Sequence, residues 1–369
     1  MVAPVRIAVD FRPALLGRSG IPRVVRELCR ALATDPSLDL RLFGHALARP
    51  VSSEGAPPGA RLHRRRFPGR LLPLAAALGF DAARLAGNAA LFHWTDYVFP
   101  PVRRGIPVVW TLHDAAFVVD PSWHGPDAAR LAARAERAAR RAARIVCPTR
   151  ATATVATERL GIAPERLRVV PWGADHAIGG KPATSRPDGT TAGTGRHLLA
   201  VGTIEPRKNH ARLLAAWRGL GAERPPLVVV GRPGWCCDDE VAMLERARID
   251  EPLTWLPAAD DATLARLYAD ALALVYPSLH EGFGLPAVEA LVRGLPVVCG
   301  DDAALTEATL GGAFHVDARS VDAIRDGIVR ALAGDAPARA AAAGRRLLAE
   351  RPWRGTAAGY RDVYRECVG

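Results

Sequence analysis

Two glutamates frame a turn whose residue types suit a phosphate held between hydroxyl-rich groups. Glu281 and Glu289 lie on either side of a segment rich in glycine and proline. The apolar run 271–276 predicts a buried strand, and the apolar residues from Leu285 onward predict a helix. A helix N-terminus after a glycine turn offers backbone N–H groups and a positive dipole end to an anion. Because a carboxylate repels an anion, we expect both glutamates to accept hydrogen bonds from hydroxyls, which indicates a nucleotide-sugar ligand.

Two adjacent cations occupy a second turn in the same half of the chain. Arg207 and Lys208 follow the predicted strand 197–201 and a glycine, Gly202. An arginine can bind a diphosphate through two N–H groups, while a lysine acts as a compact point charge. Of the 49 basic residues, only Lys208 and Lys181 are lysines, so a lysine beside an arginine indicates a specific need for an ammonium group. The alternative for such a pair is a solvated surface turn.

A glycine turn and a histidine at a strand end complete the set of candidate residues. Gly231 follows the predicted strand 227–230 and lets a ligand approach the backbone closely. His113 and Asp114 follow the predicted strand 108–112, and ligands bind at the carboxyl ends of strands in open parallel sheets. The alternative for His113 is a core histidine whose hydrogen bonds are satisfied.

Alternating strands and helices are predicted to position these residues. Strands are predicted over 5–9, 38–43, 90–93, 108–112, 144–147, 167–170, 197–201, 227–230, 253–256, 271–276 and 296–299. Helical patterns are predicted over 22–32, 128–143, 151–160, 211–220, 240–247 and 262–269, from residue 285 onward and near the end of the chain. This alternation is typical of parallel sheets with helices on both faces, so we expect an α/β fold of two doubly wound domains that face each other across a cleft.

A change in composition separates the two predicted domains. Between residues 179 and 195 the chain is dominated by Gly, Pro, Thr and Ser. This predicts a flexible linker over 177–195, between an N-terminal domain of residues 1–176 and a C-terminal domain of residues 196–352. We expect the last helix, about 353–369, to pack back on the N-terminal domain.

The composition is typical of a globular protein with a strong positive charge. The 369 residues are 49% hydrophobic and carry a formal net charge of +11. No apolar run reaches the ~18 residues of a membrane-spanning helix, and the first ten residues predict a strand rather than a signal peptide. The six cysteines include no CxxC pair, which favours reduced thiols in a cytoplasmic protein. The charge permits nucleic acid, anionic lipid or phosphorylated ligands as partners.

One segment carries a separate hypothesis of membrane contact. The arginines at 64–66 precede an apolar helical pattern that ends near Phe80, with leucines at positions 71, 72, 74 and 78. A basic flank beside an apolar helix can dock on an anionic membrane. The alternative is an amphipathic helix that faces the core and has a solvated basic flank.

Taken together, these motifs resemble the family-4 glycosyltransferases of the GT-B fold. The resemblance rests on Gly-Thr-Ile-Glu-Pro-Arg-Lys-Asn at 202–209, Ser-Leu-His-Glu-Gly-Phe-Gly-Leu-Pro-Ala-Val-Glu-Ala at 278–290 and Gly-Leu-Pro-Val-Val at 294–298. Gly20-Ile21-Pro22, His113-Asp114 and Val-Pro-Trp-Gly at 170–173 also match, so the resemblance covers nearly the whole chain. It is closest to the bacterial mannosyltransferase-like branch of surface-polysaccharide assembly.

The resemblance implies a role for each candidate residue. Arg207 and Lys208 would hold the donor diphosphate and stabilise charge on the leaving nucleotide. Glu281 would engage hydroxyls of the donor sugar, Glu289 would accept hydrogen bonds from the ribose, and His113 would contact the sugar from the opposite, acceptor-side domain. The loop residues expected at the donor are Gly20, Gly202, Thr203, Gly231, Gly282, Phe283, Gly284 and Leu285.

The resemblance also implies a reaction. We expect retaining transfer of a hexose, with GDP-mannose as the favoured donor, to the hydroxyl of a glycan or lipid-linked acceptor in cell-surface polysaccharide assembly. No metal or other cofactor is implied. The expected location is cytoplasmic, with a peripheral position at the inner face of the membrane as a hypothesis. The same chemistry with a UDP- or TDP-sugar and a small-molecule or natural-product acceptor is the alternative.

Three other classes of protein fit the sequence less well. Nucleotide-sugar 2-epimerases share the fold but lack this pairing of Glu281 and Glu289 with an Arg-Lys turn. A nucleic-acid-binding protein would need an aromatic strand face or a recognition helix with clustered bases, whereas the arginines here are spread over alanine-rich helices. A protein that binds a nucleotide-sugar without transferring it would be expected to lose Glu281 or Lys208. We therefore expect an enzyme that does not bind nucleic acid.

Overall fold

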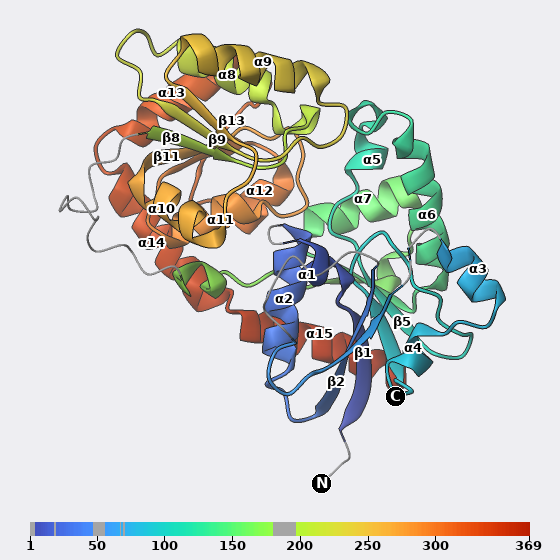
Figure 1. Cartoon of the computed structure of the whole chain (residues 1–369). Helices are drawn as coiled ribbons and strands as arrows, with labels where there is room; N and C mark the ends of the chain where they lie inside the picture. Colours follow the sequence, from blue (N-terminus) through green and yellow to red (C-terminus); the bar gives the residue numbers. More distant parts are fainter. Residues whose placement is uncertain (1–3, 18–19, 47–55, 67, 69–70, 180–196) are drawn as a thin grey trace. The chain divides into compact units, whose positions relative to one another are not determined.

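The chain divides into two compact units, each built on one parallel sheet (Figure 1). The computed structural model describes residues 4–17, 20–46, 56–66, 68, 71–179 and 197–369. Unit 1 comprises Met1–Val118, Ala129–Gly173 and Trp353–Gly369, and unit 2 comprises Val119–Ala128 and Ala174–Pro352. Residues 180–195 of the predicted linker lie outside the described residues.

Unit 1 contains a seven-stranded sheet in the order β3-β2-β1-β4-β5-β6-β7. Its strands are β1 (Val5–Asp10), β2 (Leu38–His45), β3 (Arg61–Arg65), β4 (Leu91–Trp94), β5 (Val108–Thr111), β6 (Arg144–Cys147) and β7 (Leu167–Val169). The helices that lie wholly or mostly in this unit are α1 (Arg12–Leu16), α2 (Ile21–Leu32), α3 (Leu72–Ala77), α4 (Ala82–Leu85), α5 (Ala116–Val119), α6 (Asp127–Arg141), α7 (Arg150–Leu160) and α15 (Trp353–Val368).

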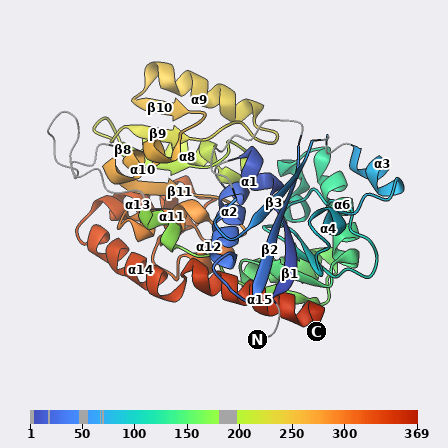
Figure 2. The same cartoon turned by 60° about the horizontal axis from the view of Figure 1, so that its bottom comes forward.

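Helices cover both faces of the unit 1 sheet. Alanines of α4, α6 and α7 pack with Phe92, Trp110 and Ile145 in one buried core. On the other face α15 lies against α2 (Figure 2) and also contacts β4 and β5. Because side chains alternate along a strand, His93 of β4 points away from that core, and its Nδ1 accepts a hydrogen bond of 2.8 Å from the hydroxyl of Tyr364 in α15.

Unit 2 contains a six-stranded sheet in the order β10-β9-β8-β11-β12-β13. Its strands are β8 (His197–Val201), β9 (Leu227–Val230), β10 (Leu253–Leu256), β11 (Ala271–Tyr276), β12 (Val297–Gly300) and β13 (Phe314–Val316). Its helices are α8 (His210–Arg218), α9 (Asp238–Asp250), α10 (Asp261–Asp270), α11 (Leu285–Val292), α12 (Ala303–Ala308), α13 (Val321–Leu332) and α14 (Ala336–Glu350). Short 3-10 helices lie at Pro121–Trp123, Pro164–Arg166, Asp175–Gly179 and Pro206–Lys208.

Both sheets have the strand order of a doubly wound α/β domain. In unit 1 the order reverses between β1 and β4, and in unit 2 it reverses between β8 and β11. All pairings in both sheets are parallel, so the carboxyl ends of neighbouring strands meet at one edge. Ligands of open α/β sheets bind outside this edge at the point of reversal. In unit 2 that point lies between the turns after β8 and β11.

Two strands that were not predicted, β3 and β13, both lie at the edge of a sheet. Central strands of a parallel sheet are buried on both faces and form apolar runs, such as Leu227–Val230. In contrast, β3 has the sequence Arg-Leu-His-Arg-Arg, and β13 has only three residues. Arg64 and Arg65, which we expected as the basic flank of an apolar helix, belong to the edge strand β3. Within the described ranges, no helix has the length and apolarity that crossing a membrane requires.

Candidate functional site

Backbone and side-chain hydrogen bonds join the turns that follow β8 and β11. The backbone N–H of Leu279 donates to the carbonyl oxygen of Arg207 at 2.8 Å. The side-chain amide of Asn209 donates to the carbonyl oxygen of Pro277 at 3.0 Å. Asn209 itself adopts a left-handed conformation with φ of 63°, which ends the 3-10 turn and starts α8. The cations at 207 and 208 are thereby fixed beside the second turn.

Arg207, Lys208 and Glu281 form one buried ion-paired cluster in unit 2. Nη1 of Arg207 lies 3.2 Å from Oε2 of Glu281, and Nζ of Lys208 forms an ion pair with Oε1 of the same carboxylate. The hydroxyl of Tyr276, the last residue of β11, donates to Oε1 of Glu281 at 2.6 Å and accepts from Nζ of Lys208 at 2.7 Å. Glu205 adds a second carboxylate, 2.8 Å from Nη2 of Arg207.

The cluster shifts the ionisation of its members in opposite directions. Burial by itself raises the pKa of Glu281, but the charges of Lys208 and Arg207 and hydrogen bonds from Lys208 and Tyr276 outweigh it and hold this pKa at about 2. Burial and the charge of Arg207 lower the pKa of Lys208, against the attraction of Glu281 and Glu205. Burial and the carboxylate of Glu281 raise the pKa of Tyr276 well above its ordinary value. At neutral pH, Glu281 is therefore an anion and Tyr276 a neutral donor.

The turn after β9 lies against the turn after β8. Ile204 and Pro233 form an isolated parallel bridge between them. A Cβ atom added to Gly231 would lie 1.7 Å from the carbonyl oxygen of Gly202. Only a glycine allows these backbones to approach so closely. Gly202 itself lies beside the cluster, since a Cβ atom there would lie 3.7 Å from side-chain atoms of Lys208 and Tyr276.

The glycine loop leads directly into the first turn of α11. Gly284 has a φ of 84°, which favours glycine, and a proline occupies the start of the helix, where its missing N–H costs no hydrogen bond. The side chains of Phe283 and Leu285 are buried, and the guanidinium of Arg351 lies 5.9 Å from the Phe283 ring centroid. Any ligand contact from residues 282–285 therefore has to come mainly from backbone atoms.

Glu289 lies in a different hydrogen-bond network of unit 2. Its Oε1 accepts from Nε2 of His176 at 3.0 Å, and its Oε2 accepts from the hydroxyl of Tyr268 at 3.2 Å. Tyr268 comes from α10, and His176 comes from the 3-10 helix Asp175–Gly179. The two predicted glutamates thus have different partners.

His113 lies in unit 1, beyond the end of β5. Its Nε2 donates to the carbonyl oxygen of Thr95 at 2.6 Å, and burial lowers the pKa of the ring, so the imidazole is neutral. Its Nδ1 is buried and has no hydrogen-bond partner within the described residues. Gly20, also in unit 1, precedes α2 with a φ of 65°.

These networks include several residues that were not predicted. Tyr276, Glu205, His176 and Tyr268 were not predicted as site residues. Glu205 stands two residues before Arg207, and Tyr276 ends a predicted strand, so their positions carried a signal. His176 and Tyr268 are remote in sequence from Glu289, and no local pattern connects them. Across the described residues, no group of three or more His, Cys, Asp or Glu side chains is placed to hold a metal ion.

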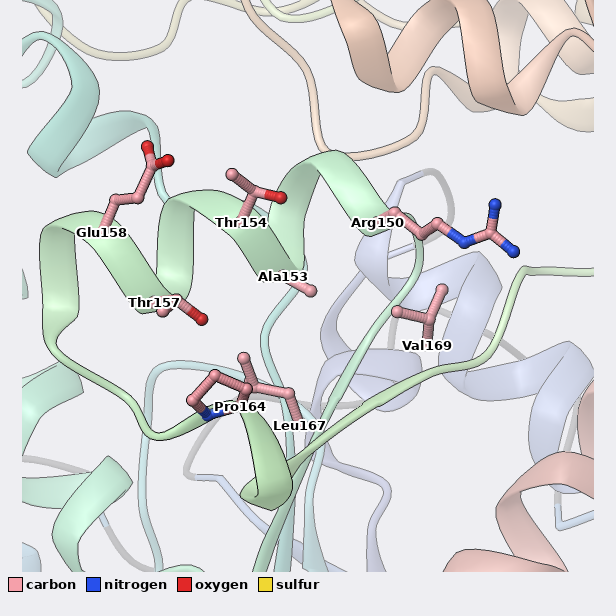
Figure 3. Close-up of a pocket in the computed structure, with 8 residues that line it drawn as sticks. All are labelled: Arg150, Ala153, Thr154, Thr157, Glu158, Pro164, Leu167 and Val169. Carbon is pink, nitrogen blue, oxygen red and sulfur yellow. The ribbon is translucent and has the colours of Figure 1, made fainter.

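A separate hollow lies on unit 1, between α7 and β7 (Figure 3). Its volume is about 370 Å³, and it is lined by Arg150, Ala153, Thr154, Thr157, Glu158, Pro164, Leu167 and Val169. It contains none of the predicted site residues.

Family models match both halves of the chain. Residues 18–178 match the model described as glycosyltransferase family 4, and residues 183–346 match the model described as glycosyl transferases group 1. The chain is 30% identical over 350 residues to a D-inositol 3-phosphate glycosyltransferase of Actinosynnema mirum. The aligned region covers 85% of this chain and 83% of that protein. It is 39% identical over 142 residues to the O-antigen chain mannosyltransferase B of Escherichia coli, which covers 38% of this chain and 37% of that protein.

The chain spans only part of the mannosyltransferases that it matches, 37% of that enzyme and 22% of the serotype-specific mannosyltransferase WbdA of Escherichia coli. Solved structures show the fold. Sucrose-phosphate synthase from Thermosynechococcus elongatus has a TM-score of 0.78 at 20% identity and covers 98% of both chains. HepE of Anabaena in complex with UDP-glucose has a TM-score of 0.73 at 16% identity and covers 98% of this chain and 99% of that one. The predicted GT-B fold class is confirmed.

Proposed function

Because the chain belongs to glycosyltransferase family 4, we propose that it transfers a hexose from a nucleoside-diphosphate sugar to the hydroxyl of a glycan or lipid-linked acceptor. GDP-mannose is the donor that we favour, and cell-surface polysaccharide assembly is the proposed context. The likeness to the O-antigen chain mannosyltransferase B supports mannose as the sugar and polysaccharide assembly as the context.

The observation that carries this proposal is the cluster of Arg207, Lys208 and Glu281 at the point where the strand order of unit 2 reverses. A diphosphate needs cations and N–H donors, and a sugar needs carboxylate acceptors for its hydroxyls. Both kinds of group are buried together here, where a low dielectric strengthens their interactions. An ordinary solvated Arg-Lys turn would not be buried against a carboxylate and a tyrosine.

Each residue has a proposed part in the transfer. Arg207 and Lys208 bind the diphosphate and stabilise the charge that develops on the leaving nucleotide. Glu281 accepts hydrogen bonds from the donor sugar, and Glu289, held by His176 and Tyr268, accepts from the ribose. The unpartnered Nδ1 of His113 accepts from a donor hydroxyl, while the hydrogen bond to Thr95 fixes its tautomer. Gly20, Gly202, Thr203 and Gly231 bring backbone atoms to the donor.

Thermal shift tests this proposal, with GDP-mannose, UDP-glucose and TDP-glucose as ligands. We expect GDP-mannose to raise the melting temperature most, and acceptor addition to release GDP from it. If none of the three sugars shifts the melting temperature, the proposed donor site is wrong. Tight binding of an oligonucleotide at high salt would instead favour the nucleic-acid alternative, because non-specific binding to phosphates weakens steeply with salt.

A second candidate uses the same chemistry with another donor and acceptor. A D-inositol 3-phosphate glycosyltransferase, that of Actinosynnema mirum, matches this chain over 83% of its own length. Its name supports a small-molecule acceptor, and in this alternative we pair that acceptor with a UDP- or TDP-sugar as donor. A larger thermal shift with UDP-glucose than with GDP-mannose would favour this alternative.

We also propose that α3 of unit 1 contacts an anionic membrane. Leu71, Leu74 and Leu78 flank or occupy this short helix and are 43%, 57% and 79% exposed, whereas Leu72 is buried. Their spacing of three and four residues places them on one side of the helix. Exposed leucines that follow the arginines of β3 in the chain suit a surface with acyl chains and anionic head groups. Phe67, Gly69 and Arg70 of the predicted segment lie outside the described residues.

Sedimentation with vesicles containing an anionic phospholipid tests the membrane contact. The double variant Leu74→Ser and Leu78→Ser is expected to lose about tenfold in vesicle binding, because two exposed side chains lose their transfer into the acyl region. The matched control is Val329→Ser with Leu332→Ser on α13, whose side chains are 52% and 40% exposed. Equal binding by both double variants and the wild type would contradict the proposal.

A further inference from the structure

The cations of the proposed diphosphate site are ion-paired to carboxylates of the protein itself. Nη1 of Arg207 lies 3.2 Å from Glu281, and Nη2 lies 2.8 Å from Glu205. Lys208 forms an ion pair with the other carboxylate oxygen of Glu281. Two cations and two carboxylates thus face one another, and their formal charges cancel. All four side chains are largely buried, so bulk water screens them little.

A diphosphate cannot simply add to such a balanced cluster. Its negative charge would lie within a few ångström of the carboxylate of Glu281, and like charges repel strongly at this distance in a buried site. The repulsion is avoided when Glu281 moves away from Arg207 and Lys208 as the diphosphate arrives. The carboxylate then needs new hydrogen-bond donors, because an unpaired buried charge is costly.

We propose that Glu281 takes the place of the donor diphosphate on Arg207 and Lys208, and that this makes it the residue that selects the intact donor over bare diphosphate. The inference rests on the proposed function, in which these two cations hold the diphosphate. When a nucleoside-diphosphate sugar binds, the hydroxyls of its sugar supply the donors that the displaced carboxylate needs. A diphosphate without a sugar displaces the carboxylate and supplies none.

Tyr276 holds the carboxylate of Glu281 in position beside the two cations. Its hydroxyl donates to Oε1 of Glu281 at 2.6 Å and accepts from Nζ of Lys208 at 2.7 Å, so one hydroxyl bridges both charges. Nζ of Lys208 also lies 5.0 Å from the centroid of the Tyr276 ring. Tyr276→Phe would keep the ring and both charges but remove the bridge. The carboxylate would then be displaced more easily.

Calorimetry with inorganic pyrophosphate tests this inference, because pyrophosphate carries neither a base nor a sugar. We expect Glu281→Gln to bind pyrophosphate at least about tenfold more tightly than the wild type, since an opposing charge is removed. We expect Tyr276→Phe to lie between the two. The nucleoside diphosphate product should also inhibit Glu281→Gln more strongly than the wild type, when the inhibition constant of each protein is divided by its donor dissociation constant.

Glu251→Gln is the matched control in the same unit. Glu251 also holds two cations, with Nη2 of Arg218 at 2.5 Å and Nη2 of Arg224 at 3.1 Å. The control changes the net charge by the same amount as Glu281→Gln, but away from the site. Its affinity for pyrophosphate should match that of the wild type. An equal gain in both glutamine variants would overturn the inference, because a general increase in positive charge would explain it.

The other outcomes separate this inference from the proposed function. If Lys208→Met abolishes pyrophosphate binding and Glu281→Gln does not strengthen it, the inference that Glu281 takes the place of the diphosphate is wrong. The proposed diphosphate site is then still supported. If pyrophosphate binds to Lys208→Met and to the wild type with equal affinity, the proposed diphosphate site is wrong. The inference about Glu281 is then wrong as well, because it depends on that site. If Glu281→Gln does not fold, Tyr276→Phe decides, and unchanged pyrophosphate affinity in that variant overturns the inference.

Discussion

Lys208→Met is expected to lower kcat/KM for the donor by about a thousandfold, which corresponds to about 4 kcal/mol of transition-state stabilisation. Methionine keeps most of the length and apolar contacts of the lysine stem, so the change removes mainly the charge. The lost ammonium lies beside Glu281 and Tyr276, in the cluster that we propose to bind the diphosphate. Steady-state kinetics measure the loss, with the melting temperature as the check that the variant is folded.

Lys208→Arg distinguishes charge from shape at the same position. A guanidinium is planar and larger than an ammonium, and the space for it is limited by Tyr276 and Arg207. We therefore expect this variant also to lose donor affinity, by about tenfold. The matched control for Lys208→Met is Arg218→Met on α8, since the guanidinium of Arg218 is half-exposed and pairs with Glu251. Wild-type kinetics in Lys208→Met would remove this residue from the site.

The sequence was sufficient to predict the frame of the site, because local patterns determine it. The strand 227–230 and the start of the helix at Leu285 agree with the structure, since an apolar run and a glycine–proline boundary are local signals. The chain order of strands and helices also brings the turns after β8 and β11 to one edge. Arg207, Lys208 and Glu281 could therefore be selected together from the sequence.

The partners of these residues could not be predicted, because they depend on tertiary packing. We expected Arg207 and Lys208 to be available for a phosphate, whereas in the structure both are ion-paired to Glu281. We expected Glu289 to accept hydrogen bonds from ribose hydroxyls, and its oxygens accept from His176 and Tyr268, two partners that the sequence did not indicate. Hydrogen bonds between residues far apart in the chain have no periodic pattern in the sequence. The same limit applies to β3, a polar edge strand whose pairing with β2 is decided by the sheet.

Gly231 supports the site through backbone packing, and its replacement tests that role. The backbone N–H of Gly231 donates to the carbonyl oxygen of Leu256 at 2.9 Å, and that of Gly202 donates to Val230 at 2.9 Å. Both turns are thus held by the ends of neighbouring strands. A methyl group at 231 would lie 1.7 Å from the carbonyl oxygen of Gly202, so one turn has to move and lose these hydrogen bonds.

Gly231→Ala is therefore expected to destabilise unit 2 by about 3 kcal/mol, which lowers the melting temperature of that unit by roughly 8 °C. Gly202→Ala is the matched control, because its methyl group would meet only side-chain atoms of Lys208 and Tyr276 at 3.7 Å, an ordinary contact. We expect that control to melt within about 2 °C of the wild type. Differential scanning calorimetry on both variants decides the matter. Equal melting temperatures of the two variants would mean that the turns after β8 and β9 separate easily. The close approach of their backbones would then contribute nothing to the rigidity of the proposed site.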